Sequence, residues 1–353
     1  MPDALHPRHL IVRVAEIAAV IGLVAIAVDA LPGLDAVRAR LQHADAVWIV
    51  ALGLAEVGSC LGYLLVFRST FCAQMPWGLS YDIAMAELAA NSLLPAGGAG
   101  GLALGVWALR QAGMPAGHIA RRTVAFFVIT SAANFLTLVV VGLAVFAGIV
   151  AGSGSVALTL LPALITALGV LLAVVSPRLL RGLERRTAAG DGAGWRGRGA
   201  RKLRGWLRAG ADGVDQAIAL LRSHSRGAIA GSLAYMAFDI AALGCGFAAV
   251  GPVPAAGTLV LAYLIGQLGN LIPLPGGVGG TEGALIGMFV LYGVDLTHAT
   301  AAVLGYRLFA LLIPAIVGAP AFILLRRRLI RSDQPALLCE PLAIDTYELP
   351  ARS

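Results

Sequence analysis

The chain is 353 residues long, and its composition excludes an ordinary soluble protein. Hydrophobic residues make up 59% and charged residues 13%, whereas charged residues make up about a quarter of a soluble globular domain. The mean hydropathy of +0.85 indicates a protein with several membrane helices. The net charge is +7, but 12 of the 26 basic residues fall in one loop, residues 178–226. A basic loop beside membrane helices is a topology signal, so no nucleic-acid partner is expected.

Residues 1–176 form the first predicted half of the membrane part. A transmembrane helix needs about 20 apolar residues to cross about 30 Å of hydrocarbon. The segments that meet this length are residues 10–30, 46–68, 119–149 and 155–176. Residues 80–110 instead divide into two short apolar pieces on either side of Pro95. Because neither piece is long enough to cross alone, we expect a re-entrant helical hairpin here.

Residues 227–330 form the second predicted half, after a basic cytoplasmic loop at residues 177–226. The predicted spans of this half are residues 227–250 and 297–325, with the span at 155–176 shared between the halves. Residues 257–292 carry two prolines and a glycine cluster that break an apolar segment into a second hairpin. Residues 331–353 are polar, contain three prolines and are expected to form a disordered cytoplasmic tail.

The distribution of basic residues predicts the orientation, because cytoplasmic loops carry an excess of Lys and Arg. With a cytoplasmic N-terminus and two re-entrant hairpins, 23 of the 26 basic residues fall on the cytoplasmic side. Both termini are then cytoplasmic, and the hairpins enter from opposite faces. We therefore predict an all-α polytopic membrane protein with about six full spans plus two re-entrant helical hairpins, arranged as inverted repeats.

The two hairpins contain an internal repeat. Residues 90–101 read ANSLLPAGGAGG and residues 269–280 read GNLIPLPGGVGG, and the two align without a gap. Asn91 falls on Asn270, and the two glycine pairs of one copy fall on those of the other. Paired hydrophobic segments interrupted by Gly and Pro in two halves are the best sequence indication of a transporter binding site.

The two hairpin turns form a predicted anion site. A half-helix that begins at such a turn directs its free N–H groups and the positive end of its dipole at the bilayer centre, which favours a phosphate. The residues predicted to bind a lipid headgroup are Asn91, Pro95, Gly97, Gly98, Gly100 and Gly101 in the first copy, and Asn270, Pro275, Gly276, Gly277, Gly279, Gly280, Glu282 and Arg307 in or after the second.

Two alternatives remain open for these residues. The glycines also follow the four-residue spacing that lets membrane helices pack closely, namely Gly97, Gly101 and Gly105, and again Gly279, Gly283 and Gly287. Packing alone would not explain the adjacent prolines or Glu282. Arg307 lies deep in a span, where a lone cation costs at least about 2.5 kcal/mol. It can bind a phosphate, form an ion pair with Glu282 or Asp239, or do both.

Three carboxylates, Glu56, Asp239 and Glu282, lie within apolar segments. Buried carboxylates are typical of proton relays, so these residues are candidates for proton coupling. The alternative is that neighbouring polar side chains satisfy them. No catalytic residue, metal site or cofactor is expected, because the sequence has no GxxxxGK[ST], no HExxH and no clustered His and Cys residues.

A family resemblance rests on the second hairpin. The motif NxxPxPGGxGxxE at residues 270–282, together with Gly293, Arg307 and the weaker PxGGxGG copy at residues 95–101, resembles the flippase-like membrane domain of lysylphosphatidylglycerol synthases. The resemblance covers most of residues 10–328. It implies movement of a phospholipid or lipid-linked precursor between the leaflets of a prokaryotic plasma membrane.

The resemblance also has limits that shape the expected function. Nothing after Arg331 resembles a soluble aminoacyl-transferase domain, so lysyl transfer is not expected. Leu102 and Ala103 stand where the second copy has Thr281 and Glu282, so the two hairpins are not expected to be functionally equal. The leading hypothesis is a lipid flippase-like transporter that is not an enzyme and whose partner is an anionic membrane lipid. The alternatives are an ion-coupled small-solute transporter or channel, and a membrane-embedded transferase with Glu282 as base.

Overall fold

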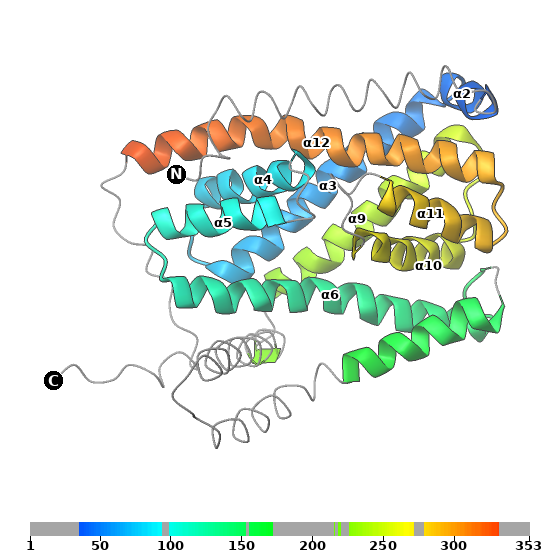
Figure 1. The fold of residues 1–353 in the computed structure, drawn as a ribbon, viewed down its shortest axis with the longest axis horizontal. Helices are drawn as coiled ribbons and strands as arrows, with labels where there is room; N and C mark the ends of the chain where they lie inside the picture. Colours follow the sequence, from blue (N-terminus) through cyan, green and yellow to red (C-terminus); the bar gives the residue numbers. More distant parts are fainter. Residues whose placement is uncertain are drawn as a thin grey trace, which may run out of the picture.

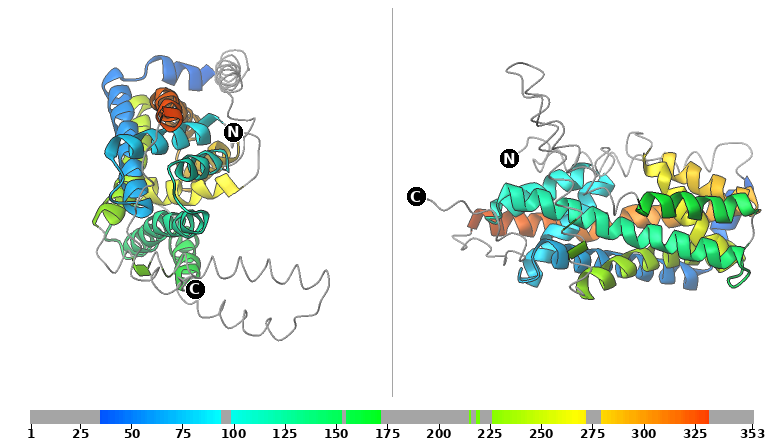
Figure 2. Two further views of the ribbon diagram at one scale, coloured as in Figure 1. Left: turned by 90° about the vertical axis from the view of Figure 1, so that its left-hand side faces the viewer. Right: turned by 90° about the horizontal axis from the view of Figure 1, so that it is seen from below.

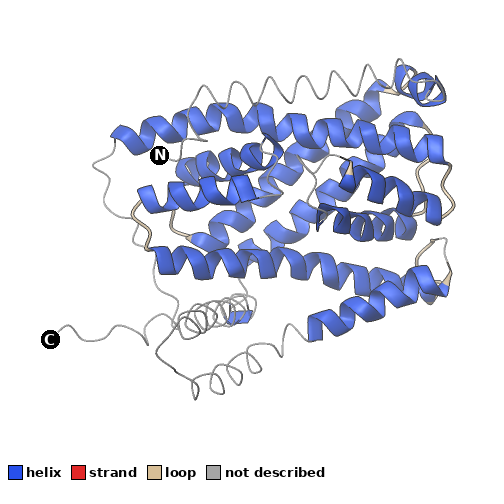
Figure 3. Ribbon diagram, viewed as in Figure 1, coloured by secondary structure: helices blue, strands red, loops and turns tan. Residues whose placement is uncertain are grey.

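A computed structural model describes residues 35–93, 99–152, 155–171, 215, 218–219, 226–271 and 279–331. These parts of the chain are helical and contain no strand (Figure 3). The labelled helices are α2 (Asp35–Gln42), α3 (Ala46–Phe71), α4 (Trp77–Leu93), α5 (Ala99–Gln111), α6 (Ala116–Phe146), α9 (Arg226–Val250), α10 (Ala256–Gly266), the 3-10 turn η2 (Gln267–Leu271), α11 (Gly280–Leu291) and α12 (Leu296–Arg331). The predicted segment 10–30, most of the basic loop and the tail after Arg331 lie outside the described residues.

Four helices, α3, α6, α9 and α12, are long and apolar enough to cross a membrane. Each exceeds the hydrocarbon thickness of about 30 Å at about 1.5 Å per residue. They coincide with four of the predicted spans. A further apolar helix, Val156–Leu171, covers the described part of the fifth and is shorter. The protein is therefore an all-helical membrane protein, while the total of six spans stays a prediction.

The two interrupted segments form two pairs of short helices. α4 packs against α5, and α10 with η2 packs against α11. With 17, 13, 11 and 12 residues, these four helices are each too short to cross alone. The pairs lie between α6 and α12, toward opposite ends of the bundle (Figures 1 and 2). This placement agrees with hairpins that enter from opposite faces, and the inverted-repeat relation itself stays a prediction.

The second helix of each pair ends in the same way. α5 is followed by Gly113 at a φ of 90°, and α11 is followed shortly by Gly293 at a φ of 87°. In both, the glycine N–H bonds a carbonyl three residues back and the next N–H bonds one five residues back. This helix ending needs a left-handed residue, which glycine adopts without a Cβ penalty. Gly113 and Gly293, which correspond when the alignment of the repeat is extended with one inserted residue, therefore have equivalent backbone roles.

The most extensive contact between described helices joins α3 to α9. A Cβ added at Gly62 would overlap the backbone of Tyr235, and one added at Gly231 would overlap the backbone of Val66. Each glycine also belongs to a GxxxG pair, with Gly58 on α3 and Gly227 on α9. Small residues at this spacing let two membrane helices approach backbone to backbone. The crossing fixes which side chains of the two central helices face each other.

The described helices form two apolar cores. One gathers buried residues of α3, α4, α5 and the first half of α6, with Phe67 and Phe126 among its aromatic rings. The other gathers residues of α9, α10, α11 and α12, where the rings of Phe247 and Phe289 meet at 4.6 Å between centroids. Each helix pair thus has a separate core, and the central helices belong to both.

The α3–α9 crossing predicts different outcomes for two alanine substitutions on the same helix. Gly62→Ala places a methyl group into the Tyr235 backbone, so we expect it to cost about 1–3 kcal/mol, as overpacking does. At Gly53 the added Cβ would lie 3.6 Å from a ring carbon of Phe309, an ordinary contact. Gly53→Ala should therefore leave the melting temperature unchanged or raise it. Thermal unfolding in detergent measures both, and equal melting temperatures would contradict the prediction.

Candidate functional site

The start of α11 carries a carboxylate that binds both its own helix and Arg307. Glu282 Oε2 accepts a hydrogen bond from the Gly279 N–H at 2.7 Å. Its other oxygen, Oε1, accepts from Arg307 Nε at 2.7 Å. The side chains of Arg307 and Glu282 are only 16% and 11% exposed. The negative charge of Glu282 thus occupies the position at the helix N-terminus that the sequence predicts for a phosphate.

The ion pair leaves part of the arginine unused. The bond to Glu282 is made by Nε, so it does not engage the two terminal NH₂ groups of the Arg307 fork. Arginine can contact two anionic groups at once because its five N–H donors point in different directions. The alternative of an ion pair with Glu282 is therefore present, and it does not remove the capacity of Arg307 to bind a phosphate.

Asp239 lies beside this pair with both of its oxygens engaged. Tyr306 donates a hydrogen bond to Oδ1 at 2.7 Å, and Tyr263 donates one to Oδ2. Asp239 also interacts electrostatically with Arg307 and with Glu56. Residues from α3, α9, α10, α11 and α12 thus form one buried polar cluster, which brings together the three carboxylates named from the sequence.

Glu56 is the least satisfied member of this cluster. The residue is 5% exposed, and its Oε2 has no hydrogen-bond partner in the structure. A buried ionised carboxylate without a partner is costly. Its charged neighbours are Asp239, which repels a negative charge, and Arg307, which attracts one. The arrangement suits a group that holds a proton, and proton coupling through Glu56, Asp239 and Glu282 stays a prediction.

The first helix pair is joined by Asn91. Its Oδ1 accepts a hydrogen bond from the Gly101 N–H at 3.0 Å, linking the end of α4 to the first turn of α5. The aligned position in the second copy, Asn270, lies in η2. An uncharged amide thus caps one helix, whereas a carboxylate caps the other. This difference agrees with the expectation that the two hairpins are not functionally equal.

Helix packing explains the glycines of the first copy better than those of the second. A Cβ added at Gly101 would lie 2.5 Å from the backbone carbonyl oxygen of Glu87, so the close approach of α4 and α5 needs a glycine there. A Cβ added at Gly279, Gly283 or Gly287 would meet no described atom within 4 Å. The described residues thus show no packing partner for the glycine spacing on α11, and the packing alternative stays open there. These three glycines are exposed along the described helix that carries Glu282.

Several predicted site residues lie outside the described residues. They are Pro95, Gly97, Gly98, Pro275, Gly276 and Gly277. Gly100 is described in the first turn of α5 and Gly280 in the first turn of α11. In the described part of the chain, no group of three or more His, Cys, Asp or Glu side chains is placed to hold a metal ion.

Four buried polar groups were not predicted from the sequence. Tyr263 and Tyr306 bind Asp239, and Tyr63 interacts with Glu87. The available signal was a tyrosine or a glutamate inside an apolar segment, since a polar group in hydrocarbon needs a partner. The partners themselves come from helices distant in sequence and become visible only in the fold.

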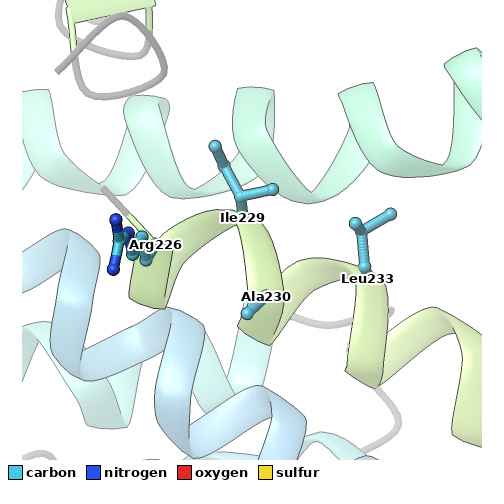
Figure 4. A pocket seen from close by; sticks show the side chains of 4 residues that line it. All are labelled: Arg226, Ile229, Ala230 and Leu233. Carbon is cyan, nitrogen blue, oxygen red and sulfur yellow. The ribbon is translucent and has the colours of Figure 1, made fainter. Parts of the chain in front are cut away.

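A shallow apolar groove lies elsewhere on the molecule. It has a volume of about 510 Å³ and is lined by Arg226, Ile229, Ala230 and Leu233 of α9 (Figure 4). None of the predicted site residues lines it. The candidate site is therefore the buried polar cluster and not this groove.

The fold and the cluster define a polytopic helical membrane protein with two broken-helix pairs around buried charges. The family model of the lysylphosphatidylglycerol synthase TM region matches residues 13–318, and the chain belongs to this family. The chain is also similar to a UPF0104 membrane protein of Methanothermobacter thermautotrophicus, with 37% identity over 93 residues. That match spans about a quarter of each protein, 26% of this chain and 26% of the relative.

The Arg307–Glu282 pair can be tested by a double-mutant cycle. Arg307→Ala leaves a shielded carboxylate without its cation, so we expect it to lower the free energy of unfolding by about 3–5 kcal/mol. Glu282→Ala should also destabilise the protein, because it removes the helix cap and leaves the guanidinium unpaired. The double variant should lose clearly less than the sum of the two. Unfolding in detergent supplies the free energies, and additive losses would show that the pair is not coupled.

Proposed function

We propose that this protein moves an anionic lipid, a phospholipid or a lipid-linked precursor, between the leaflets of a prokaryotic plasma membrane. The observation that carries the proposal is the Glu282–Arg307 pair at the N-terminus of α11. In it, a carboxylate of the protein fills a site whose donors, a helix N–H and a guanidinium, also suit a phosphate. The lipid headgroup would bind at this site while its acyl chains stay in the bilayer.

The carboxylate of Glu282 would then compete with the lipid headgroup for Arg307. A phosphate that approaches Arg307 either shares its fork with Glu282 or displaces the carboxylate. Protonation of Glu282 removes the negative charge that holds Arg307, so it would favour the lipid. Because both events act on the same donors, headgroup binding and proton binding at Glu282 are linked in the proposed mechanism. Asp239 and Glu56 lie in the same cluster and can receive or supply the proton.

The surroundings of the Glu282–Arg307 pair support entry of a lipid headgroup from the side of the bundle. Among the described residues, no atom would lie within 4 Å of a Cβ added at Gly279, Gly283 or Gly287, which gives a lipid headgroup room to approach along α11. The two helix pairs lie toward opposite ends of the bundle, as alternating exposure to the two faces would require. The sequence contains no nucleotide-binding motif, so the proposed drive is a proton gradient or the lipid gradient itself.

The family supports a lipid-related role and leaves the activity to experiment. In the orientation that the basic residues predict, both termini face the cytoplasm. We propose a transporter and not an enzyme, so the chemical mass of the lipid should stay unchanged. A changed lipid mass would instead indicate the membrane-embedded transferase. Transport of a water-soluble ion or solute, with no lipid movement, would indicate the ion-coupled carrier or channel.

A lipid-translocation assay tests the site directly. In vesicles containing fluorescent anionic phospholipid, the wild-type protein should speed the exchange of label between leaflets. Arg307→Ala should lower that rate about 10- to 100-fold, as the loss of contacts to a charged group predicts. Arg307→Lys keeps the charge but loses the fork, so an intermediate rate is expected.

The matched control for this assay is Arg38→Ala. Arg38 lies on α2 in an exposed pair with Asp35, away from the buried cluster. This variant should translocate lipid at the wild-type rate. Wild-type protein that exchanges no tested anionic lipid faster than protein-free vesicles would refute the proposed function. Equal rates for Arg307→Ala and wild type would instead refute the site.

A further inference from the structure

The first helix pair encloses a carboxylate that the proposed lipid site does not use. Glu87 lies on α4, is 8% exposed, and its Oε2 has no hydrogen-bond partner in the structure. This oxygen points at α5, because a Cβ added at Gly105 would lie 2.9 Å from it. The Tyr63 hydroxyl, on α3, interacts with the Glu87 carboxyl. Residues of α3 and α5 thus both contact the Glu87 carboxyl group.

The groups around Glu87 offer no positive charge for an ion pair. α4 is contacted by α3, α5 and α12. The titratable group that α3 presents is Tyr63, and α5 presents Gly105. α12 packs Gly318 against Met85 and Ala89, and its Arg328 is paired with Asp82 nearer the start of α4. Among the described residues, Glu87 therefore has a phenol as its neighbour and no cation.

We propose that Glu87 is a proton-binding site of the first helix pair, occupied at neutral pH while α4 and α5 are packed together. An ionised carboxylate with a free oxygen would be costly at this depth, whereas a carboxylic acid hydrogen-bonded to Tyr63 is tolerated. The proton leaves to water when α4 and α5 separate and returns before they close. The release of the Glu87 proton is then coupled to the separation of α4 and α5.

The site is also connected to the cluster around Asp239. The rings of Tyr63 and Tyr235 meet edge to face, with centroids 5.5 Å apart. Tyr235 in turn interacts electrostatically with Asp239 and Glu56. Tyr63 and Tyr235 thus form a chain of contacts across the α3–α9 crossing, from Glu87 to the groups beside Arg307. The role of this link in transport rests on the proposed function. The proton site at Glu87 does not depend on that function.

Infrared spectroscopy tests the proton site without any transport assay. The full chain is purified in dodecyl maltoside, which has no ester carbonyl, and measured at pH 7.5. Exposed carboxyl groups are ionised at this pH, since their ordinary pKa is about 4. The spectrum of wild type minus Glu87→Gln should show the carbonyl band of a protonated carboxyl group. Bands of an ionised carboxylate in that difference would overturn the proposal.

Two further variants keep the test decisive. Tyr63→Phe removes the hydrogen bond but not the carboxyl, so the Glu87 band should move to higher wavenumber, and an unmoved band would overturn the Glu87–Tyr63 pair. This measurement also serves if Glu87→Gln fails to fold. Glu56→Gln is the matched control, because it removes a buried carboxyl of the other cluster. The Glu87 band should persist in it.

The pH profile of lipid translocation tests the link to movement. Wild-type translocation should change as the pH rises and Glu87 loses its proton, whereas Glu87→Gln, which stays uncharged, should lack this alkaline change. A variant that keeps the wild-type alkaline change would overturn the link. A protein that moves no lipid but shows the Glu87 band would refute the proposed function and leave the proton site standing.

Discussion

The backbone contact between α3 and α9 is the constraint on which the buried site depends. Gly62 and Gly231 let the two helices touch without intervening side chains, and no larger residue fits there without moving a backbone. The contact sets the rotation of each helix, so that Glu56 faces Asp239 and Tyr63 faces Tyr235. Without this crossing the acidic residues would lie on separate helices with no shared environment. A packing feature of small residues therefore determines the electrostatics of the centre.

Burying this many polar groups is costly, and the protein offsets the cost with internal partners. Arg307 is matched by Glu282, and Asp239 by two tyrosine hydroxyls. A buried pair contributes little net stability compared with apolar packing, so the presence of these groups points to function. In the proposed transport, a ligand's phosphate would replace the internal carboxylate at the same donors, so Arg307 would have an anionic partner in both states.

The sequence predicted the long helices and the interrupted segments well, because length and hydropathy are local properties. It also identified Glu282, Arg307 and Asp239 as related, since a charge in a span needs a partner. It did not predict which residues meet: Tyr263 and Tyr306 reach Asp239 from two other helices. The glycine spacing was ambiguous for a physical reason. Gly101 is needed for packing against the Glu87 backbone, whereas Gly283 faces no other described atom, and the two positions look the same in one dimension.

The two helix pairs share a backbone plan and differ in charge. Both end their second helix at a left-handed glycine, and both begin it beside an aligned glycine cluster. In one pair the helix start is capped by the amide of Asn91, and in the other by the carboxylate of Glu282. Two equal sites would offer the same chemistry to both faces of the membrane. The ion pair of Glu282 with Arg307 of α12 stands at the start of α11 in the second pair, so the two pairs present different chemistry at equivalent backbone positions.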